Sequence, residues 1–173
     1  PRASIVFFRD NGHCFYSSVM GRDDIPEISL LRKLVVGLVG RHIGVLGHKL
    51  TTCLEEHVEK RSSGAGQPRG EWMVSNQWCD AEQKPICLSF TETGLTKDHP
   101  AMEVFRRCWG QVGPNGLSDG HGTELCLSAL AMSTGITFTV ALMVGGSSPS
   151  QPLQLYYMQE FSKAAPFGQV VNT

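Results

Sequence analysis

Cys14 lies at a position in the chain where a thiol can act as a nucleophile. It follows Gly12 and His13 and opens the run Cys-Phe-Tyr-Ser-Ser-Val, which has the apolar content of a short helix. The unpaired backbone N–H groups at a helix start favour a thiolate and can also bind an oxyanion. This arrangement suits attack on a carbonyl carbon. The alternative interpretation is a buried structural cysteine, because free cysteine is among the most buried residue types.

Residues 11–16, Asn-Gly-His-Cys-Phe-Tyr, resemble the active-site signature of the ovarian-tumour (OTU) family of cysteine proteases. That signature is Asp-Gly-x-Cys followed by two bulky apolar or aromatic residues. Later features follow one another in the same order as in the family. They are a Met at Met73, a Trp at Trp78, a helix of the Glu-Leu-x-x-Leu-Ala type at Glu124 to Ala131, and a strand at Ile136 to Val140. The resemblance implies a deubiquitinase with a papain-type fold.

The resemblance also implies roles for the residues of the Cys14 turn. Cys14 would be the nucleophile, with its own backbone N–H in the oxyanion hole, and Asn11, Gly12 and His13 would shape the turn. Asn11 replaces the family's Asp, and an Asn side chain can still donate and accept hydrogen bonds that hold a turn. His13 is expected on the surface, because neighbouring side chains at a helix start diverge.

The general base is the residue that the pattern leaves open. The family's histidine follows the last strand, whereas this sequence has no histidine after His121. His121 is the best candidate, because it lies in a glycine-flanked turn before the Glu124 helix and Asp119 is close enough in sequence to orient an imidazole. A base beyond Thr173 in a longer parent protein is the other possibility.

Three functional hypotheses follow. The first is a thiol-dependent deubiquitinase that cleaves the isopeptide bond after ubiquitin or a ubiquitin-like protein. The second is a catalytically degenerate OTU-fold module that binds ubiquitin or another protein without turnover, which the missing terminal histidine favours. The third is an unrelated thiol enzyme, such as an acyltransferase, that uses Cys14 with His121.

Composition limits the class of protein. The chain has 173 residues, 41% of them hydrophobic and 18% charged, which suits a single OTU-like domain over residues 1–173. The chain starts at Pro1, without Met, as expected of a piece of a longer protein. With a net charge of -1 and a sequence pI near 6.7, the chain lacks the excess of basic residues that is typical of nucleic-acid-binding proteins. Glycines, Arg41 and His42 interrupt the longest apolar stretch, 34–46, so no membrane span is expected.

The six cysteines show no Cys-x-x-Cys spacing, which favours scattered reduced thiols and a cytoplasmic location. For the same reason we expect no metal site, although His99, Cys108 and His121 could in principle converge. No cofactor is expected. Lone histidines such as His42, His48 and His57 are interpreted as polar edges of packed helix faces.

The pattern predicts an α+β fold with helices packed on a small β-sheet. A first helix ends at Gly21, and a second begins at Asp24-Ile25-Pro26-Glu27 and runs to about Gly40, with its apolar face at Ile28, Leu31, Leu34, Val35 and Leu38. Other helices are expected from Thr52, after His99-Pro100 and from Thr123 to Gly135. In the helix after His99-Pro100, Met102, Phe105 and Trp109 fall at helical spacing and are expected to face the core. Gly110 to Gly122 is predicted to be flexible, a short strand is expected over 85–90, and residues 137–144 and 153–158 are predicted to form a hairpin.

Overall fold

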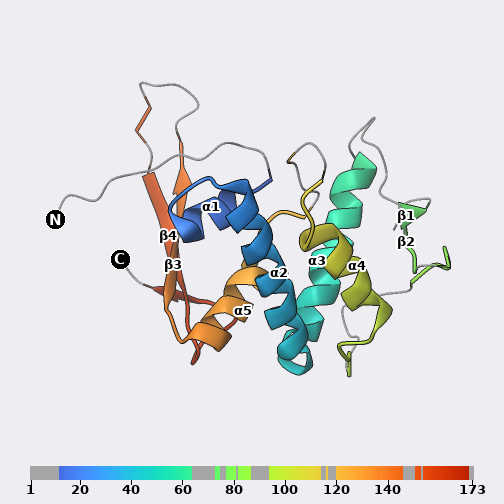
Figure 1. Ribbon diagram of the computed structural model, residues 1–173. Helices are drawn as coiled ribbons and strands as arrows, with labels where there is room; N and C mark the ends of the chain where they lie inside the picture. The colour runs from blue at the N-terminus through green and yellow to red at the C-terminus, as the bar shows by residue number, and fades with distance from the viewer. Residues whose placement is uncertain are drawn as a thin grey trace.

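The chain folds into five helices and two small antiparallel sheets within the described residues (Figure 1). The computed structural model describes residues 12–63, 73–74, 77–80, 82–86, 94–113, 116, 120–145, 151–152 and 154–171. In chain order the elements are α1 (Cys14–Met20), α2 (Ile25–Arg41), α3 (Ile43–Ser63), β1 (Met73–Val74), β2 (Gln77–Trp78), α4 (Pro100–Trp109), α5 (Glu124–Thr134), β3 (Phe138–Val144), β4 (Gln154–Phe161) and β5 (Gln169–Val171).

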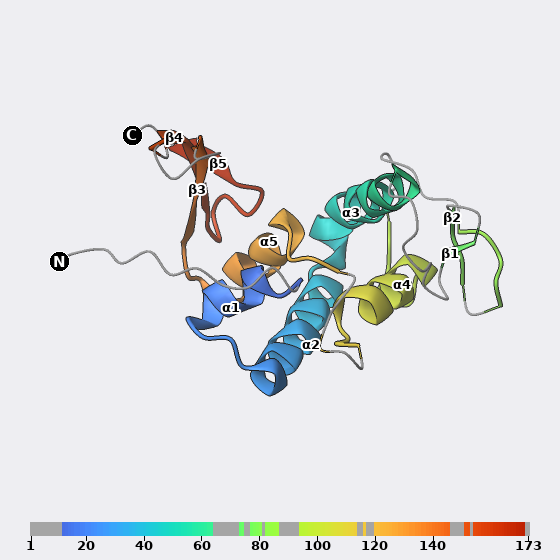
Figure 2. The same ribbon diagram turned by 90° about the horizontal axis from the view of Figure 1, so that it is seen from above.

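The helices form the centre of the molecule, with one sheet on either side of them. Figures 1 and 2 both place β3, β4 and β5 at one side, next to α1 and α5, and β1 and β2 at the opposite side, beyond α3 and α4. β4 is the middle strand of its sheet and pairs antiparallel with both neighbours, with an irregularity in register between Leu142 and Met143. The predicted hairpin over 137–144 and 153–158 is therefore confirmed, and β4 extends it to Phe161.

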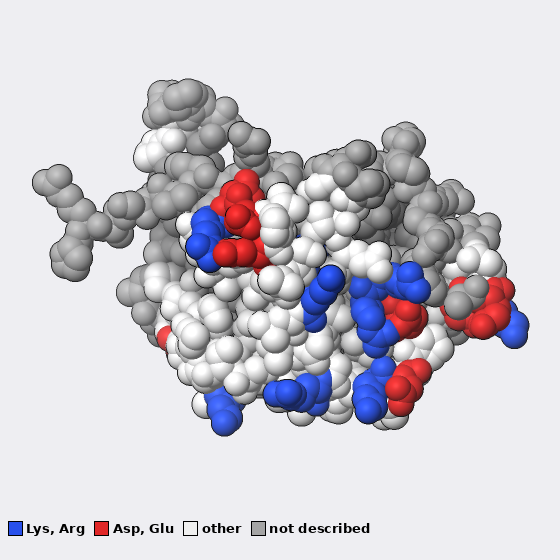
Figure 3. Space-filling view, viewed as in Figure 1, with Lys and Arg blue, Asp and Glu red and all other residues white. Residues whose placement is uncertain are grey.

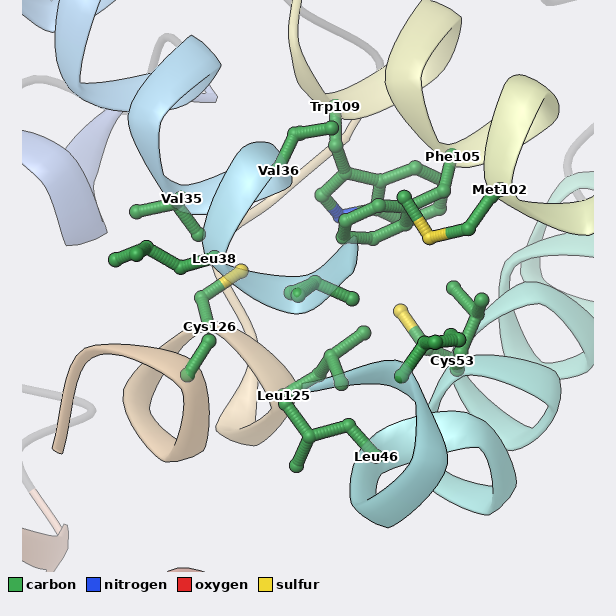
Figure 4. Packing of buried hydrophobic residues seen from close by; sticks show 14 of the residues in the cluster. Val35, Val36, Leu38, Leu46, Cys53, Met102, Phe105, Trp109, Leu125 and Cys126 are labelled. Carbon is green, nitrogen blue, oxygen red and sulfur yellow. The ribbon is translucent and has the colours of Figure 1, made fainter. Parts of the chain in front are cut away.

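The hydrophobic core lies between α2 and the helices around it. α2 packs against α1, α3, α4 and α5, and Figure 4 shows side chains from α2 to α5 converging on one interior. Phe105 and Trp109 stack with ring centroids 5.0 Å apart and are almost fully buried, as their helical spacing predicted. Burial of each large apolar side chain contributes about 1.5–3 kcal/mol, so this cluster is the main source of stability.

Local signals fixed most helix ends. The Asp24 side chain accepts a hydrogen bond from the backbone N–H of Glu27 and so caps the start of α2, while Gly21 and Gly135 adopt the left-handed conformation after α1 and α5. The helix start predicted at Thr52 is wrong. Thr52 lies inside α3, where its hydroxyl donates to the carbonyl of His48, one turn earlier.

The α+β class is confirmed, but the arrangement of the layers differs from the prediction. The helices pack mainly on one another, because every helix but α1 contributes several buried apolar side chains to the shared core. The sheet meets them through β4, which contacts α5, and through Phe138 of β3, which packs against the core. Most of β3 is exposed along its length, although consecutive side chains of a strand point to opposite faces. Both faces of this part of the sheet are therefore open within the described structure. Of the short strand expected over 85–90, Pro85 bridges Cys79 and residues 87–90 lie outside the described residues.

Candidate active site at the start of α1

Cys14 is the first residue of α1, and its side chain is exposed. The helix begins there, since the backbone N–H of Ser17 donates to the carbonyl of His13 and the Ser18 hydroxyl donates to the carbonyl of Cys14 at 2.7 Å. The backbone N–H of Cys14 belongs to the first turn, where no intrahelical acceptor exists. The thiol therefore lies at the surface beside a backbone donor, which is the arrangement that an attack on a carbonyl requires.

His13 contradicts its expected surface position, because the imidazole is fully buried. Its Nε2 lies 2.7 Å from the carbonyl oxygen of Gly116, and its Nδ1 accepts a hydrogen bond from Nε of Arg32 at 3.0 Å. The ring is therefore neutral with the proton on Nε2, which donates to Gly116. The side chain points inward, away from the thiol next to it, and anchors the turn.

Arg32 of α2 stabilises the Cys14 turn by hydrogen bonds to the residues on its buried side. Besides His13, its guanidinium donates to the carbonyl oxygens of Gly12, Trp109 and Gly120, the last two at 2.9 and 2.7 Å, and its Cζ lies 4.2 Å from the centre of the Tyr16 ring. The side chain is fully buried, and desolvation lowers the pKa of Arg32 from its ordinary value. Within the described residues no carboxylate pairs with it, so carbonyl dipoles and an aromatic face compensate the charge.

The segment that carries His121 is held directly against α1. A Cβ atom at Gly122 would lie 2.1 Å from Cγ of Phe15, and one at Gly120 would lie 2.5 Å from Cγ of Trp109. The Trp109 indole N–H donates to the carbonyl oxygen of His121 at 2.8 Å. The two glycines therefore permit close contact rather than flexibility, which corrects the prediction for this part of the 110–122 segment. His121 itself is exposed, next in the chain to the residue that touches Phe15.

The structure thus brings Cys14, Gly12, His13 and the His121 segment into one region, although more than a hundred positions separate the ends of this set in sequence. Asn11 and Asp119, which were predicted to shape the turn and to orient His121, lie outside the described residues. His42 and His57 lie elsewhere. His42 pairs with the Ser133 hydroxyl at 2.9 Å, and the His57 ring stacks on Trp78.

Sequence reasoning missed Arg32. The buried residues of α2 are Ile28, Arg32, Val35, Val36, Leu38 and Val39, whereas Leu34, assigned to the buried face, is 54% exposed. Arg32 therefore occupies an apolar position of the helix, four residues after Ile28 and four before Val36. A cation in the middle of an apolar stripe was the available signal, because a buried charge has to be compensated by partners of its own.

We expect iodoacetamide to modify Cys14 faster than the other described cysteines. Cys14 is exposed, Cys53, Cys79 and Cys126 are buried, and Cys108 is partly buried. Burial also raises the pKa of the Cys126 thiol, which disfavours its reactive thiolate. Tryptic peptide mass spectrometry after timed labelling gives the rates, with Cys126 as the internal reference. Equal rates at Cys14 and Cys126 would refute the assignment of an accessible thiol.

Acid is expected to destabilise the fold through His13. Burial is the largest cause that lowers the pKa of His13 from 6.5, and the charges of Arg32 and His121 lower it further. The hydrogen bond to Gly116 and the charge of Asp23 act in the opposite direction, but the net shift is downward. Below pH 6.5 the unfolded chain binds a proton that folded His13 resists, so stability is lost as the pH falls from 6.5 through the folded pKa. Urea denaturation between pH 7.5 and 5 measures this loss. A His13→Gln variant should lose less stability over the same range, and an equal loss in both proteins would assign the effect to other groups.

Comparison with protein-family models, with curated proteins and with solved structures finds no match for this chain. None of the described helices is long and apolar enough to cross a bilayer. Within the described part of the chain, no three His, Cys, Asp or Glu side chains come together as metal ligands would.

Proposed function

We propose that this chain is a thiol-dependent hydrolase of the OTU type that cleaves the isopeptide bond after ubiquitin or a ubiquitin-like modifier. The observation that carries the proposal is the exposed thiol of Cys14 at the first position of α1, with the His121 segment in contact with Phe15. A free thiol with a candidate base supplied by a distant segment is the minimum that nucleophilic catalysis requires. The resemblance of residues 11–16 to the OTU signature gives the proposal its substrate, and the cytoplasm is the compartment we propose.

The chemical steps follow from these groups. His121 takes the thiol proton, and the Cys14 sulfur attacks the carbonyl carbon of the terminal glycine of ubiquitin. The backbone N–H of Cys14 donates to the resulting oxyanion. His121 then protonates the departing lysine amine as the C–N bond breaks, which leaves a thioester on Cys14. Water, activated by the same imidazole, hydrolyses the thioester and releases ubiquitin with a free carboxylate.

An exposed apolar surface on the sheet of β3, β4 and β5 supports a protein substrate. Val140, Leu142 and Val144 of β3 are each at least 40% exposed, and Tyr156 of β4 is 70% exposed. Both ribbon views place β3 on the side of the molecule where α1 and α5 lie (Figures 1 and 2). Ubiquitin offers an apolar patch and an extended C-terminal tail, and exposed apolar patches of this kind are typical of protein interaction sites.

Covalent capture by ubiquitin-propargylamide tests the proposal. Attack of the Cys14 thiol on the alkyne is expected to give a stable adduct, visible as a larger species in a denaturing gel. The adduct should be absent from Cys14→Ala and retained by Cys108→Ala, which removes another thiol that is not fully buried. An adduct that forms equally well on Cys14→Ala would overturn the assignment of the nucleophile.

A binding module without turnover is the second candidate. The observation that favours it is the absence of any histidine after His121, where the OTU family places its base. This candidate predicts saturable binding of ubiquitin in titration calorimetry and no capture by the probe. Capture without binding preference for ubiquitin would instead support a thiol enzyme of another class, such as an acyltransferase.

A further inference from the structure

A concave site lies between α2 and α4. Its volume is about 580 Å³, and the floor includes the buried side chains of Val36 and Met102 together with the backbone of Gly37 and Gly40. Cavities of about 300–1,000 Å³ with a mainly apolar lining are typical small-molecule sites. Neither Cys14 nor any other residue of α1 lines this pocket, so it is distinct from the candidate active site.

Four basic side chains line the same pocket, and no acidic residue is among the described residues that do so. They are Lys33 and Arg41 from α2, Lys97 from the segment before α4, and Arg106 from α4. Figure 3, in the orientation of Figure 1, shows Lys and Arg side chains around an uncharged area on the face that α2 and α4 share, with acidic side chains beside some of them on the side of α4. The chain as a whole has a net charge of -1, so this grouping is local rather than a reflection of overall charge.

Three of these cations have no anionic partner within the described structure. Arg106 pairs with Glu103, but no ion pair of the described residues includes Lys33, Arg41 or Lys97. Lys33 and Arg41 are eight residues apart on α2, which separates them by about 12 Å along the helix axis. Both residues line the pocket and are exposed, so their charges are available to an anionic ligand.

Gly37 supplies the second observation that points to a ligand. It lies in the middle of α2, where glycine is unfavourable, yet a Cβ atom there would meet nothing within 4 Å. No close packing contact in the described structure therefore requires a glycine at this position. Its missing side chain instead keeps the pocket floor open between Lys33 and Arg41.

We propose that this pocket binds a small organic anion that combines an apolar body, such as a ring, with one or more acidic groups. The apolar floor suits the body, and the surrounding Lys and Arg side chains suit phosphate, sulfate, sulfonate or carboxylate groups. A metal cation would be repelled by the four charges. An inorganic anion would fill only a small part of the volume and would leave Val36 and Met102 without a partner.

Titration calorimetry with naphthalene-1-sulfonate tests the proposal, with its neutral sulfonamide analogue and with sodium sulfate as comparisons. The sulfonate should bind at one saturable site, at least tenfold more tightly than either comparison, and its affinity should fall as salt is added. In two-dimensional NMR spectra the amide shifts should concentrate in α2 and α4. Equal affinity for sulfate would show an anion site without an apolar component, and equal affinity for the sulfonamide would show no role for charge. Either result overturns the proposal.

Two pairs of variants locate the site. Gly37→Leu fills the pocket and should weaken sulfonate binding at least tenfold while raising Tm by about 2–4 °C, because a better helix former replaces glycine. Gly44→Leu is the matched control, since Gly44 is an exposed helical glycine of α3 with open space above it and does not line the pocket. Lys33→Glu should also weaken binding at least tenfold, whereas Lys84→Glu, an exposed lysine elsewhere, should not. Unchanged affinity in Gly37→Leu and Lys33→Glu would place the ligand outside this pocket.

Discussion

Replacement of His121 by alanine is expected to lower the rate of ubiquitin cleavage by about a hundredfold or more, which is the usual contribution of a general base. The proposal makes His121 the group that deprotonates Cys14 and later protonates the leaving amine. Loss of the imidazole removes both transfers but leaves the peptide backbone, which Trp109 and the Gly122 contact hold in place. Hydrolysis of ubiquitin with a fluorogenic C-terminal amide measures the rate.

His48→Ala is the control for this prediction. His48 is an exposed histidine of α3, so its removal changes the same side-chain chemistry without touching the site. Its rate should stay within about twofold of the wild-type rate. If His121→Ala also retains wild-type turnover, the base is another residue, and the role proposed for His121 is wrong even if Cys14 is captured by the probe.

Arg32→Met is expected to lower the free energy of unfolding by about 3 kcal/mol. Methionine has a similar reach but donates no hydrogen bond, so the carbonyl oxygens of Gly12, Trp109 and Gly120 lose a donor. Each buried acceptor left unpaired costs about 1–3 kcal/mol, and relief of the buried charge offsets part of the sum. The same change should also slow turnover, because the carbonyl of Gly12 and the ring of His13 position the Cys14 turn.

Lys33→Met is the matched control for stability, because it removes a cation from the adjacent position of α2, where the side chain is exposed. It should change the free energy of unfolding by less than about 0.5 kcal/mol. Arg32→Lys should recover only part of the loss, since one ammonium group cannot reach all four acceptors. A value for Arg32→Met within 1 kcal/mol of the wild-type value would mean that other donors hold these carbonyls.

Local signals were enough to predict much of the helical structure. Each of these signals acts within a few residues of the helix end or helix face that it determines. The Asp24 carboxylate caps the start of α2, and Gly21 and Gly135 end α1 and α5. The spacing of Met102, Phe105 and Trp109 determines the buried face of α4. The direction of the α2 face was harder to predict. α2 carries apolar side chains on more than one side, and those of Leu30 and Leu34 stay exposed. Which side of the helix is buried therefore depends on the elements that pack against it, and the sequence of α2 alone does not determine it.

The candidate site was predictable only in part, because contacts distant in sequence position it. Cys14 was identified from the Gly-His-Cys sequence and the apolar run after it. The inward orientation of His13 depends on Gly116, and the position of His121 depends on Phe15 and Trp109. No periodicity reports such contacts. Glycines 120 and 122 were interpreted as a flexible turn because a sequence pattern cannot distinguish glycines that permit motion from glycines that permit close packing.

The hydrogen bonds of Arg32 have a consequence for how the protein opens. One guanidinium joins Gly12, in the turn before α1, to Gly120, 108 positions later, and to the end of α4 at Trp109. Local opening of any of these segments breaks bonds that the others share, so they should open as one cooperative unit. Amide hydrogen exchange would then slow together in the first turn of α1 and in residues 120–123 when either is stabilised. A substrate that orders the turn around Cys14 would at the same time order the segment that carries His121.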